Sequence, residues 1–237
     1  PARSGMGSSS AFSVGLIRAL YAHRRESVSP EQLAKEAIHI EQNIVGETVG
    51  SQDQVSAAYG GLNKMEFRQD GEIVVQPLNI SDERKEQLNN KLMLFFTGIT
   101  RTAEEVAITY VSDIKSKKKQ LETISELTKE AQEVIERGSS LDRFGELLHD
   151  SWMMKRSLSS KVSSRGIDLM YETARSAGAL GGKLTGAGGG GMMLLYVPEN
   201  KQEIVRDALS DLLYIPFRFT TKGSEILLTD GLNDNSN

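Results

Sequence analysis

The chain has 237 residues, of which 38% are hydrophobic and 25% are charged, and its formal net charge is −4. This balance is typical of a globular protein and excludes an intrinsically disordered one, while the mild acidity argues against nucleic acid as a partner. The sequence has no cysteine, which excludes disulfides and thiolate metal sites and is compatible with the cytoplasmic location that we expect. The longest apolar run, Met192 to Val197, is far too short to span a membrane, so we expect no membrane partner.

The first ten residues, PARSGMGSSS, have the composition of a phosphate-binding loop. Gly5 and Gly7 give the backbone unusual dihedral angles and allow an anion to approach closely. Three serines follow at the start of a helix expected from about Ser9 to His23, where free N–H groups and the positive end of the dipole face outward. Such a segment can bind a phosphate and Mg²⁺, but an ordinary capped helix entry explains the composition equally well. Because such a loop normally follows a strand, we expect the front of the protein to precede this sequence.

A second helix is expected from Pro30 to about Gly46, because Ser29 and Pro30 form an N-cap followed by a first-turn proline. Its apolar stripe, Leu33, Ala34, Ala37, Ile38, Ile44 and Val45, also includes one carboxylate, that of Glu41. A carboxylate that faces a core must find a cation or hydrogen-bond donors, since burying it unpaired is costly. From the helix alone, a salt bridge at the edge of the core is the favoured interpretation, and a Mg²⁺ ligand is the alternative.

A polar loop, Gly50–Gln54, leads into a short helix that ends at Gly60. Taken alone, Asp53 in this loop is an ordinary Asx-turn residue. Its neighbours favour a functional role for Asp53, because an expected anion site and a possible metal ligand, Glu41, precede it. Beside a transferring phosphoryl group, its carboxylate could orient or deprotonate an attacking hydroxyl.

The remainder of the chain is expected to mix helices and strands. Alternation on both sides of Asp70-Gly71 predicts a β-hairpin, and a soft domain boundary is expected near Asn79–Lys91. The expected hairpin strands are Leu62–Phe67 and Glu72–Ile80, and further strands are expected at Leu92–Phe96, Met192–Val197, Phe217–Thr221 and Glu225–Leu228. Expected helices cover Ala103–Arg137, with a break near Lys115–Lys119, and then Leu141–Lys155, Ser164–Ala177 and Lys201–Leu213.

A glycine-rich segment, Gly178–Gly191, holds 8 of the 22 glycines and leads directly into an apolar strand. Since side chains are nearly absent, two backbones, or a backbone and a ligand, must approach closely there. Close packing and the shaping of a binding site are both open interpretations at this point. The three histidines, His23, His39 and His149, do not cluster in the sequence, which argues against a zinc site.

Taken together, three of these segments resemble the motifs of the GHMP kinases, the superfamily of galactokinase, homoserine kinase and mevalonate kinase. Pro1 and Gly5–Ser9 are similar to the first motif, which wraps the phosphates of ATP. Glu41 followed by Gly50–Gln54 resembles the second segment, and Lys183–Gly190 resembles the third motif. One such motif is a weak signal, whereas three in the family's order, covering nearly the whole chain, are a strong one.

Within that superfamily, the sequence is most similar to the D-glycero-D-manno-heptose 7-phosphate 1-kinases, through His39–Gln42, Val49–Gln54, Phe96–Arg101 and Gly181–Gly191. The resemblance implies transfer of the γ-phosphoryl group of ATP to the anomeric hydroxyl of a heptose 7-phosphate, for nucleotide-activated heptose and surface polysaccharide. The implied partners are small molecules, ATP and a sugar phosphate, with a homo-oligomer left open. Alternatives are a relative that acts on fucose, galactose or mevalonate, and a non-catalytic nucleotide-binding relative.

The resemblance also implies roles for individual residues. The loop residues that would bind ATP are Gly5, Met6, Gly7, Ser8, Ser9 and Ser10, and Ser9 and Glu41 would hold Mg²⁺. Asp53 would be the catalytic carboxylate that engages the acceptor hydroxyl. The substrate side would be lined by Gly186, Ala187, Gly188 and Gly189, and Arg101 and Lys183 are the cationic residues that we expect to meet a sugar phosphate.

The fold that the resemblance implies is α+β, with a front part like domain 2 of ribosomal protein S5 and a ferredoxin-like C-terminal part. The expected domains are the remainder of an N-terminal ATP-binding domain, residues 1–80, a C-terminal domain, residues 81–230, and a tail, residues 231–237. ATP and the acceptor would meet in the cleft between the two parts. Family members carry an N-terminal segment before the first motif that this sequence lacks, and without it we expect an exposed sheet edge.

Overall fold

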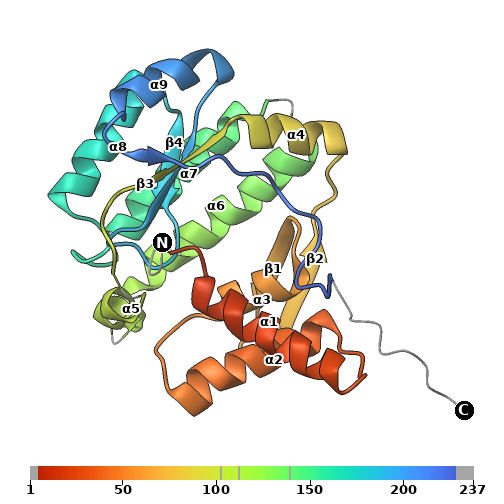
Figure 1. Cartoon of the computed structure of the whole chain (residues 1–237). Helices are drawn as coiled ribbons and strands as arrows, with labels where there is room; N and C mark the ends of the chain where they lie inside the picture. Colours follow the sequence, from red (N-terminus) through yellow and green to blue (C-terminus); the bar gives the residue numbers. More distant parts are fainter. Residues whose placement is uncertain (1–4, 102, 112, 139, 228–237) are drawn as a thin grey trace, which may run out of the picture. The chain divides into compact units, whose positions relative to one another are not determined.

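The computed structural model describes residues 5–101, 103–111, 113–138 and 140–227 (Figure 1). Contacts divide the chain into two compact units. The sheet unit comprises the described parts of residues 1–6 and 62–219, and the helical unit comprises those of residues 7–61 and 220–237. The expected domain limits at residues 80 and 230 stay a prediction. In none of the described helices do length and hydropathy together reach what crossing a membrane requires.

The helical unit contains α1 (Ser8–His23), α2 (Pro30–His39), the π-helix η1 (Ile40–Val45) and α3 (Gln52–Tyr59). As expected, Ser29 caps α2, because its side chain accepts a hydrogen bond from the Gln32 N–H at 3.1 Å. The expected helix continues only as a π-helix beyond His39, a form that is frequent at functional sites. The three α-helices pack on one another, and their buried apolar side chains are Val14, Ile17, Leu33, Ala34, Ala37, Val55 and Ala58.

The expected helices and hairpin of the sheet unit are largely confirmed. The helices are α5 (Ala103–Val111), the 3₁₀ segment η2 (Ile114–Lys117), α6 (Lys118–Arg137), α7 (Asp142–Arg156), α8 (Arg165–Ala177), the 3₁₀ segment η3 (Glu199–Lys201) and α9 (Gln202–Ala208). The hairpin pairs β1 (Asn63–Phe67) with β2 (Ile73–Pro77) in antiparallel register. An unexpected helix, α4 (Asp82–Asn90), lies where a soft domain boundary was expected, near Asn79–Lys91. The Ser81 side chain caps this helix.

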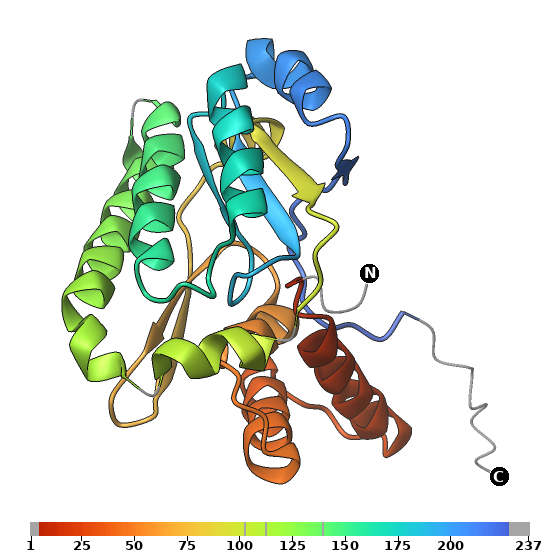
Figure 2. The same ribbon diagram turned by 90° about the vertical axis from the view of Figure 1, so that its left-hand side faces the viewer.

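A four-stranded antiparallel sheet organises the sheet unit (Figure 2). Its order is β4 (Gly181–Leu184), β5 (Met192–Tyr196), β3 (Leu92–Phe96) and β6 (Leu213–Tyr214). Successive side chains of a strand point to opposite faces, so each strand feeds two clusters. On one face Met93, Phe95, Met193 and Leu195 pack with residues of α8 and α9, and on the other Leu92, Leu194 and Tyr196 pack with residues of α4, α6 and α7. The chain is therefore α+β, as expected.

Strand β4 was not expected, because glycine has a low strand propensity. A Cβ placed on Gly181 would lie 1.8 Å from the carbonyl oxygen of Gly145 in α7, and one placed on Gly182 would lie 2.4 Å from the carbonyl oxygen of Leu194. Only glycine permits these approaches of one backbone to another. At Gly181 and Gly182, the close-packing interpretation of the glycine-rich segment is confirmed.

The expected strands Phe217–Thr221 and Glu225–Leu228 are wrong, since the described residues there, up to 227, form no strand. Phe217 and Phe219 pack instead against the apolar cluster on the α6 and α7 side of the sheet. The N–H of Phe219 donates to the side-chain oxygen of Asn89 at 2.8 Å. A side-chain acceptor on α4 thus takes the place of a neighbouring strand, which an alternating pattern in the sequence does not reveal.

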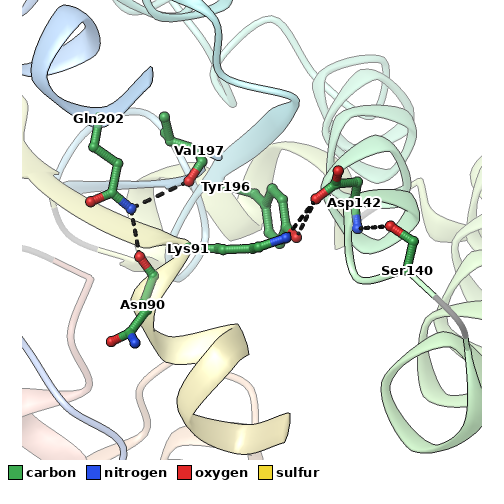
Figure 3. A network of polar contacts seen from close by, with 7 residues as sticks. All are labelled: Asn90, Lys91, Ser140, Asp142, Tyr196, Val197 and Gln202. Carbon is green, nitrogen blue, oxygen red and sulfur yellow. Dashed lines mark hydrogen bonds and ion pairs between the residues drawn. The ribbon is translucent and has the colours of Figure 1, made fainter. Parts of the chain in front are cut away.

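A polar network joins Lys91, the residue just before β3, to α7 and β5 (Figure 3). The ammonium of Lys91 lies 2.9 Å from Asp142 Oδ1, and the Tyr196 hydroxyl donates to the same oxygen at 2.9 Å. The hydrogen bond from Lys91 is the main cause that lowers the pKa of Asp142, so this carboxylate stays charged. The side chain of Gln202 donates to the Asn90 carbonyl at 2.5 Å, which ties α9 to the end of α4.

Candidate active site

The first turn of α1 in the helical unit presents free backbone donors. Gly7 is the N-cap with φ 64°, in the left-handed region that suits glycine, and no described side chain caps the helix. Ser8 and Ser9 are exposed, whereas Ser10 is buried. The N–H groups of this turn and the positive end of the helix dipole can therefore bind an anion.

Glu41 is a buried carboxylate, 4% exposed, in the π-helix η1. Its Oε2 accepts two hydrogen bonds, from Ser10 Oγ at 3.0 Å and from Gln54 Nε2 at 2.5 Å. Its Oε1 is buried and has no hydrogen-bond partner among the described residues. Within that part of the chain no cation forms an ion pair with Glu41, so the favoured salt-bridge interpretation is wrong there, and hydrogen-bond donors take its place.

The vacant Glu41 oxygen fits a hard cation such as Mg²⁺. Oxygen ligands are the ones that Mg²⁺ prefers, and it is usually held by one or two carboxylates together with substrate phosphates. Among the described residues no three His, Cys, Asp or Glu side chains gather into a metal site, so protein carboxylates alone do not form a cage there. The predicted second ligand, Ser9, is exposed at the start of α1, and its carbonyl accepts from Ser13 Oγ at 3.3 Å. The hydroxyl that reaches Glu41 belongs to its neighbour, Ser10.

Asp53 lies in the first turn of α3, within a helix rather than in an Asx turn. Its side chain packs against the backbone of Gly7, because a Cβ placed on Gly7 would lie 3.1 Å from Asp53 Cγ and 3.3 Å from Oδ2. A larger residue at Gly7 would push this carboxylate away from the start of α1. The structure thus brings together, in one unit, the anion-binding turn, the buried Glu41 and the predicted catalytic carboxylate.

The sheet unit holds the other predicted site residues, beginning with Gly5. A Cβ placed on Gly5, whose φ is 74°, would lie 3.0 Å from the carbonyl oxygen of Thr185. A Cβ placed on Gly186, with φ 61°, would lie 3.2 Å from Gly5 Cα. The backbone of the first loop therefore lies directly against the glycine-rich segment, and both sides need glycine for it. Met6, the next loop residue, is exposed.

The remaining glycines of the segment pack on a neighbouring turn. The N–H of Gly189 donates to the Val162 carbonyl at 2.7 Å, and a Cβ placed on Gly188 would lie 2.8 Å from the same oxygen. Ala187, between them, is half-buried and packs against the larger apolar cluster. Close packing is therefore confirmed for these residues, and the shaping of a binding site stays a prediction.

Two predicted cationic residues differ in their surroundings. Arg101 is exposed, and its Cδ would lie 3.0 Å from a Cβ placed on Gly189, so it lies beside the glycine-rich segment. Lys183 lies on β4, and burial lowers the pKa of its ammonium below the usual value. No hydrogen bond or ion pair joins that ammonium to any residue that the structure describes. A half-buried cation without such a partner suits an anionic ligand.

Two family models match parts of this chain. The family model of the GHMP kinases N terminal domain matches residues 1–61, and that of the GHMP kinases C terminal domain matches residues 124–215. A D-glycero-α-D-manno-heptose 7-phosphate kinase from Campylobacter jejuni is 32% identical over 228 residues, which cover 94% of this chain and 67% of the relative. The chain belongs to the GHMP kinases.

Other relatives of this GHMP kinase share its fold with different stated substrates. The crystal structure of a D-glycero-D-manno-heptose 1-phosphate kinase from Bacteroides thetaiotaomicron aligns with a TM-score of 0.73 and 26% identity, over 94% of this chain and 63% of that one. A mevalonate kinase from Methanothermobacter thermautotrophicus is 28% identical, over 94% of this chain and 70% of the relative. The chain thus spans about two thirds of the length of these relatives.

Two residues of this GHMP kinase were missed by reasoning from the sequence. Gln54 is fully buried on the same face of α3 as Val55 and Ala58, and a glutamine on an apolar stripe was a signal that could have been followed. Lys155, at the end of α7, donates to the carbonyl of Gly186 and holds the residue that touches Gly5. Nothing in the sequence around Lys155 marks this contact, because its partner is a distant backbone carbonyl.

Proposed function

We propose that this GHMP kinase transfers the γ-phosphoryl group of ATP to the anomeric hydroxyl of D-glycero-D-manno-heptose 7-phosphate. The product would be the 1,7-bisphosphate, a precursor for nucleotide-activated heptose, and the reaction would take place in the cytoplasm. The observation that carries the proposal is the buried Glu41 carboxylate, which has two donors on one oxygen and a partnerless second oxygen. The 32% identity to a heptose 7-phosphate kinase supports the choice of acceptor.

In this proposal the helical unit binds the phosphates and the metal. The N–H groups at the start of α1 bind phosphate oxygens, with Gly7 giving the backbone its left-handed turn. Ser9 and Glu41 hold Mg²⁺, which when bound would neutralise charge that develops on the phosphoryl group. Ser10 does not bind the metal in this scheme but donates to Glu41 Oε2 and so fixes the direction of Oε1.

Asp53 is proposed to act on the acceptor. Its carboxylate lies against Gly7, at the start of α1. If the start of α1 binds the phosphates, this carboxylate would lie beside the group that is transferred. There it would accept a hydrogen bond from the attacking hydroxyl, orient its oxygen and take its proton as the new P–O bond forms. The proton leaves the sugar, and the bond to the ADP leaving group breaks.

The sheet unit is proposed to bind the anionic acceptor. Gly186, Ala187, Gly188 and Gly189 supply a surface with little side-chain bulk, and Arg101 and Lys183 supply positive charge for the phosphate of the sugar. Lys183 is the stronger candidate, because it is half-buried and its ammonium has no hydrogen-bond or ion-pair partner in the described residues. An acceptor without a phosphate is the second candidate, since a mevalonate kinase matches 94% of the chain at 28% identity.

A panel of acceptors tests the proposal. ADP release by the full-length gene product is measured with Mg²⁺-ATP and D-glycero-D-manno-heptose 7-phosphate, mannose 6-phosphate, galactose, fucose or mevalonate. We expect a clear preference, in kcat/KM, for the heptose phosphate. Preference for mevalonate or a free sugar would replace the acceptor and keep the family, and no transfer to any acceptor would favour a non-catalytic relative.

The same assay includes Asp53→Asn as a control for the assigned chemistry. This variant keeps the shape of the side chain and removes its ability to take a proton, so we expect kcat to fall by roughly 100-fold or more while nucleotide affinity stays within a few fold. Turnover close to that of the wild type would refute the role of Asp53.

A further inference from the structure

The two oxygens of the Glu41 carboxylate have unequal surroundings. Among the described residues, both donors, Ser10 Oγ and Gln54 Nε2, donate to Oε2, at 3.0 and 2.5 Å. The other oxygen, Oε1, is buried and has no partner among the residues that the structure describes. A carboxylate with two donors on one side can neither rotate nor exchange its oxygens without breaking both hydrogen bonds. The donors therefore determine which oxygen stays available.

We propose that Gln54 is a positioning residue that fixes Glu41 for the metal and couples that carboxylate to Asp53. The inference rests on the proposed function, because it needs a divalent cation at Glu41. Gln54 is fully buried, comes from α3, and follows Asp53 directly in the chain. Its amide joins α3 to the π-helix η1, so one helical turn sets both the metal carboxylate and the carboxylate that engages the acceptor.

A second feature of Gln54 separates this role from ordinary packing. Its side-chain oxygen, Oε1, is also buried and has no hydrogen-bond partner within the described residues. A buried amide oxygen that stays unpaired costs stability, so a glutamine kept only for packing would be a poor choice at this position. The same side chain donates from Nε2 to Glu41 Oε2, so its amide is kept at this position by the bond to the carboxylate. Of the two free acceptors, Glu41 Oε1 belongs to the residue that the proposed function assigns to the metal, and Gln54 holds that residue in place.

The test replaces Gln54 by methionine, which has a similar length and no donor. Binding of Mn²⁺ in the presence of ADP is measured by electron paramagnetic resonance on the full-length gene product, together with the melting temperature without metal. We expect Gln54→Met to weaken Mn²⁺ binding by roughly 10- to 100-fold, the usual effect of losing a residue that orients a metal ligand. In the transfer assay, the Mg²⁺ concentration for half-maximal rate should rise by a similar factor.

Gln42→Met is the matched control. Gln42 is the residue after Glu41 in the same π-helix, and its amide donates to the Val49 carbonyl at 2.9 Å and to Ser51 Oγ at 3.1 Å. It holds a loop, and among the described residues no hydrogen bond joins its side chain to Glu41. We expect Gln42→Met to lower the melting temperature and leave the Mn²⁺ affinity within a factor of two of the wild type. A loss of metal affinity equal to that of Gln54→Met would overturn the proposal.

A second variant covers the case in which Gln54→Met does not fold. Ser10→Ala removes the other donor to Glu41 Oε2 without adding bulk, and we expect a smaller loss of Mn²⁺ affinity in the same direction. Unchanged affinity in a folded Gln54→Met, or in Ser10→Ala where the first does not fold, would overturn the role of the donors. If the wild type itself binds ADP without any dependence on the metal, the proposed function fails instead, so the two failures are distinguishable.

Discussion

The predicted site residues of the two units differ in kind. In the helical unit the site consists of side chains, Glu41, Gln54 and Ser10, which are buried and joined by hydrogen bonds. In the sheet unit it consists mainly of backbone, where Gly5 and Gly186 lie against each other with hardly any side-chain atoms between them. The first region therefore depends on charge and hydrogen-bonding capacity, and the second depends on shape.

This contrast decides which substitutions matter. A change of charge at constant shape should damage the helical unit's part of the site and leave its folding intact. A change of shape at constant charge should damage the sheet unit's part. Each unit also contains an exception that tests this rule. In the sheet unit, Lys183 is a charged residue within the glycine-rich strand, and in the helical unit, Gly7 is required for its shape beside Asp53.

Gly186→Ala should have the larger effect in the sheet unit. The residue has φ 61°, which costs a side chain about 1 kcal/mol or more, and the new Cβ would meet Gly5 Cα at 3.2 Å. We expect weaker ATP binding and a lower melting temperature, with an unchanged Mg²⁺ concentration for half-maximal rate. Calorimetric titration with ATP and thermal melting measure the two effects.

Gly166→Ala is the control for that substitution. A Cβ placed on Gly166, in α8, would meet no atom within 4 Å, and its backbone is not in the left-handed region. Alanine is the better helix former, so we expect a stability equal to or slightly above that of the wild type. Equal losses in both variants would show that the glycine contact at Gly186 is not the cause.

Lys183→Met should change the melting temperature less than Gly186→Ala does, and in the opposite direction. Burial lowers the pKa of Lys183 in the folded chain, whereas the unfolded value is about 10.4. The unfolded chain therefore binds the proton more tightly, and the charge destabilises the fold at every pH below that range. We expect Lys183→Met to raise the melting temperature at pH 7, with the gain shrinking as the pH approaches about 10.4.

The effect of Lys183→Met on the KM for the acceptor is an independent measurement. If Lys183 binds the phosphate of the sugar, its loss should raise the KM for the phosphorylated acceptor roughly tenfold or more, since a hydrogen bond to a charged group is worth about 1.5–3 kcal/mol. Lys161→Met, at an exposed lysine, should change neither quantity. A melting temperature that falls at neutral pH would assign Lys183 a structural role.

Local signals in the sequence predicted most of the fold. The cap at Ser29 and the turn at Asp70-Gly71 each depend on neighbouring residues only, and both features are present. Strand β4 was missed because its glycines are required by the Gly145 carbonyl, which is distant in the sequence. The strand expected at Phe217 was wrong because the side chain of Asn89 and an apolar cluster satisfy that segment instead.

The same difference between local signals and contacts that are distant in the sequence applies to the candidate site. The motifs indicated Glu41 and Asp53, since a carboxylate on an apolar stripe and a carboxylate after a glycine loop are both visible locally. They could not indicate that Ser10, rather than Ser9, donates to Glu41, because this depends on how η1 and α1 pack. Gln54 and Lys155 were missed for the same reason, since their partners lie 13 and 31 residues away in the chain.

The role of Glu41 as the metal carboxylate is tested by measuring ADP binding with and without Mg²⁺ in the wild type and in Glu41→Gln. Glutamine keeps the shape of the side chain and can still accept from Ser10 and Gln54, but it removes the negative charge. We expect Mg²⁺ to strengthen ADP binding in the wild type, and this gain to fall by roughly 100-fold in the variant. The melting temperature without metal should stay equal or rise, because a buried charge without an ion pair has been removed. A variant that keeps the full gain from Mg²⁺, or one that simply unfolds, would contradict the assignment of Glu41 as the metal carboxylate.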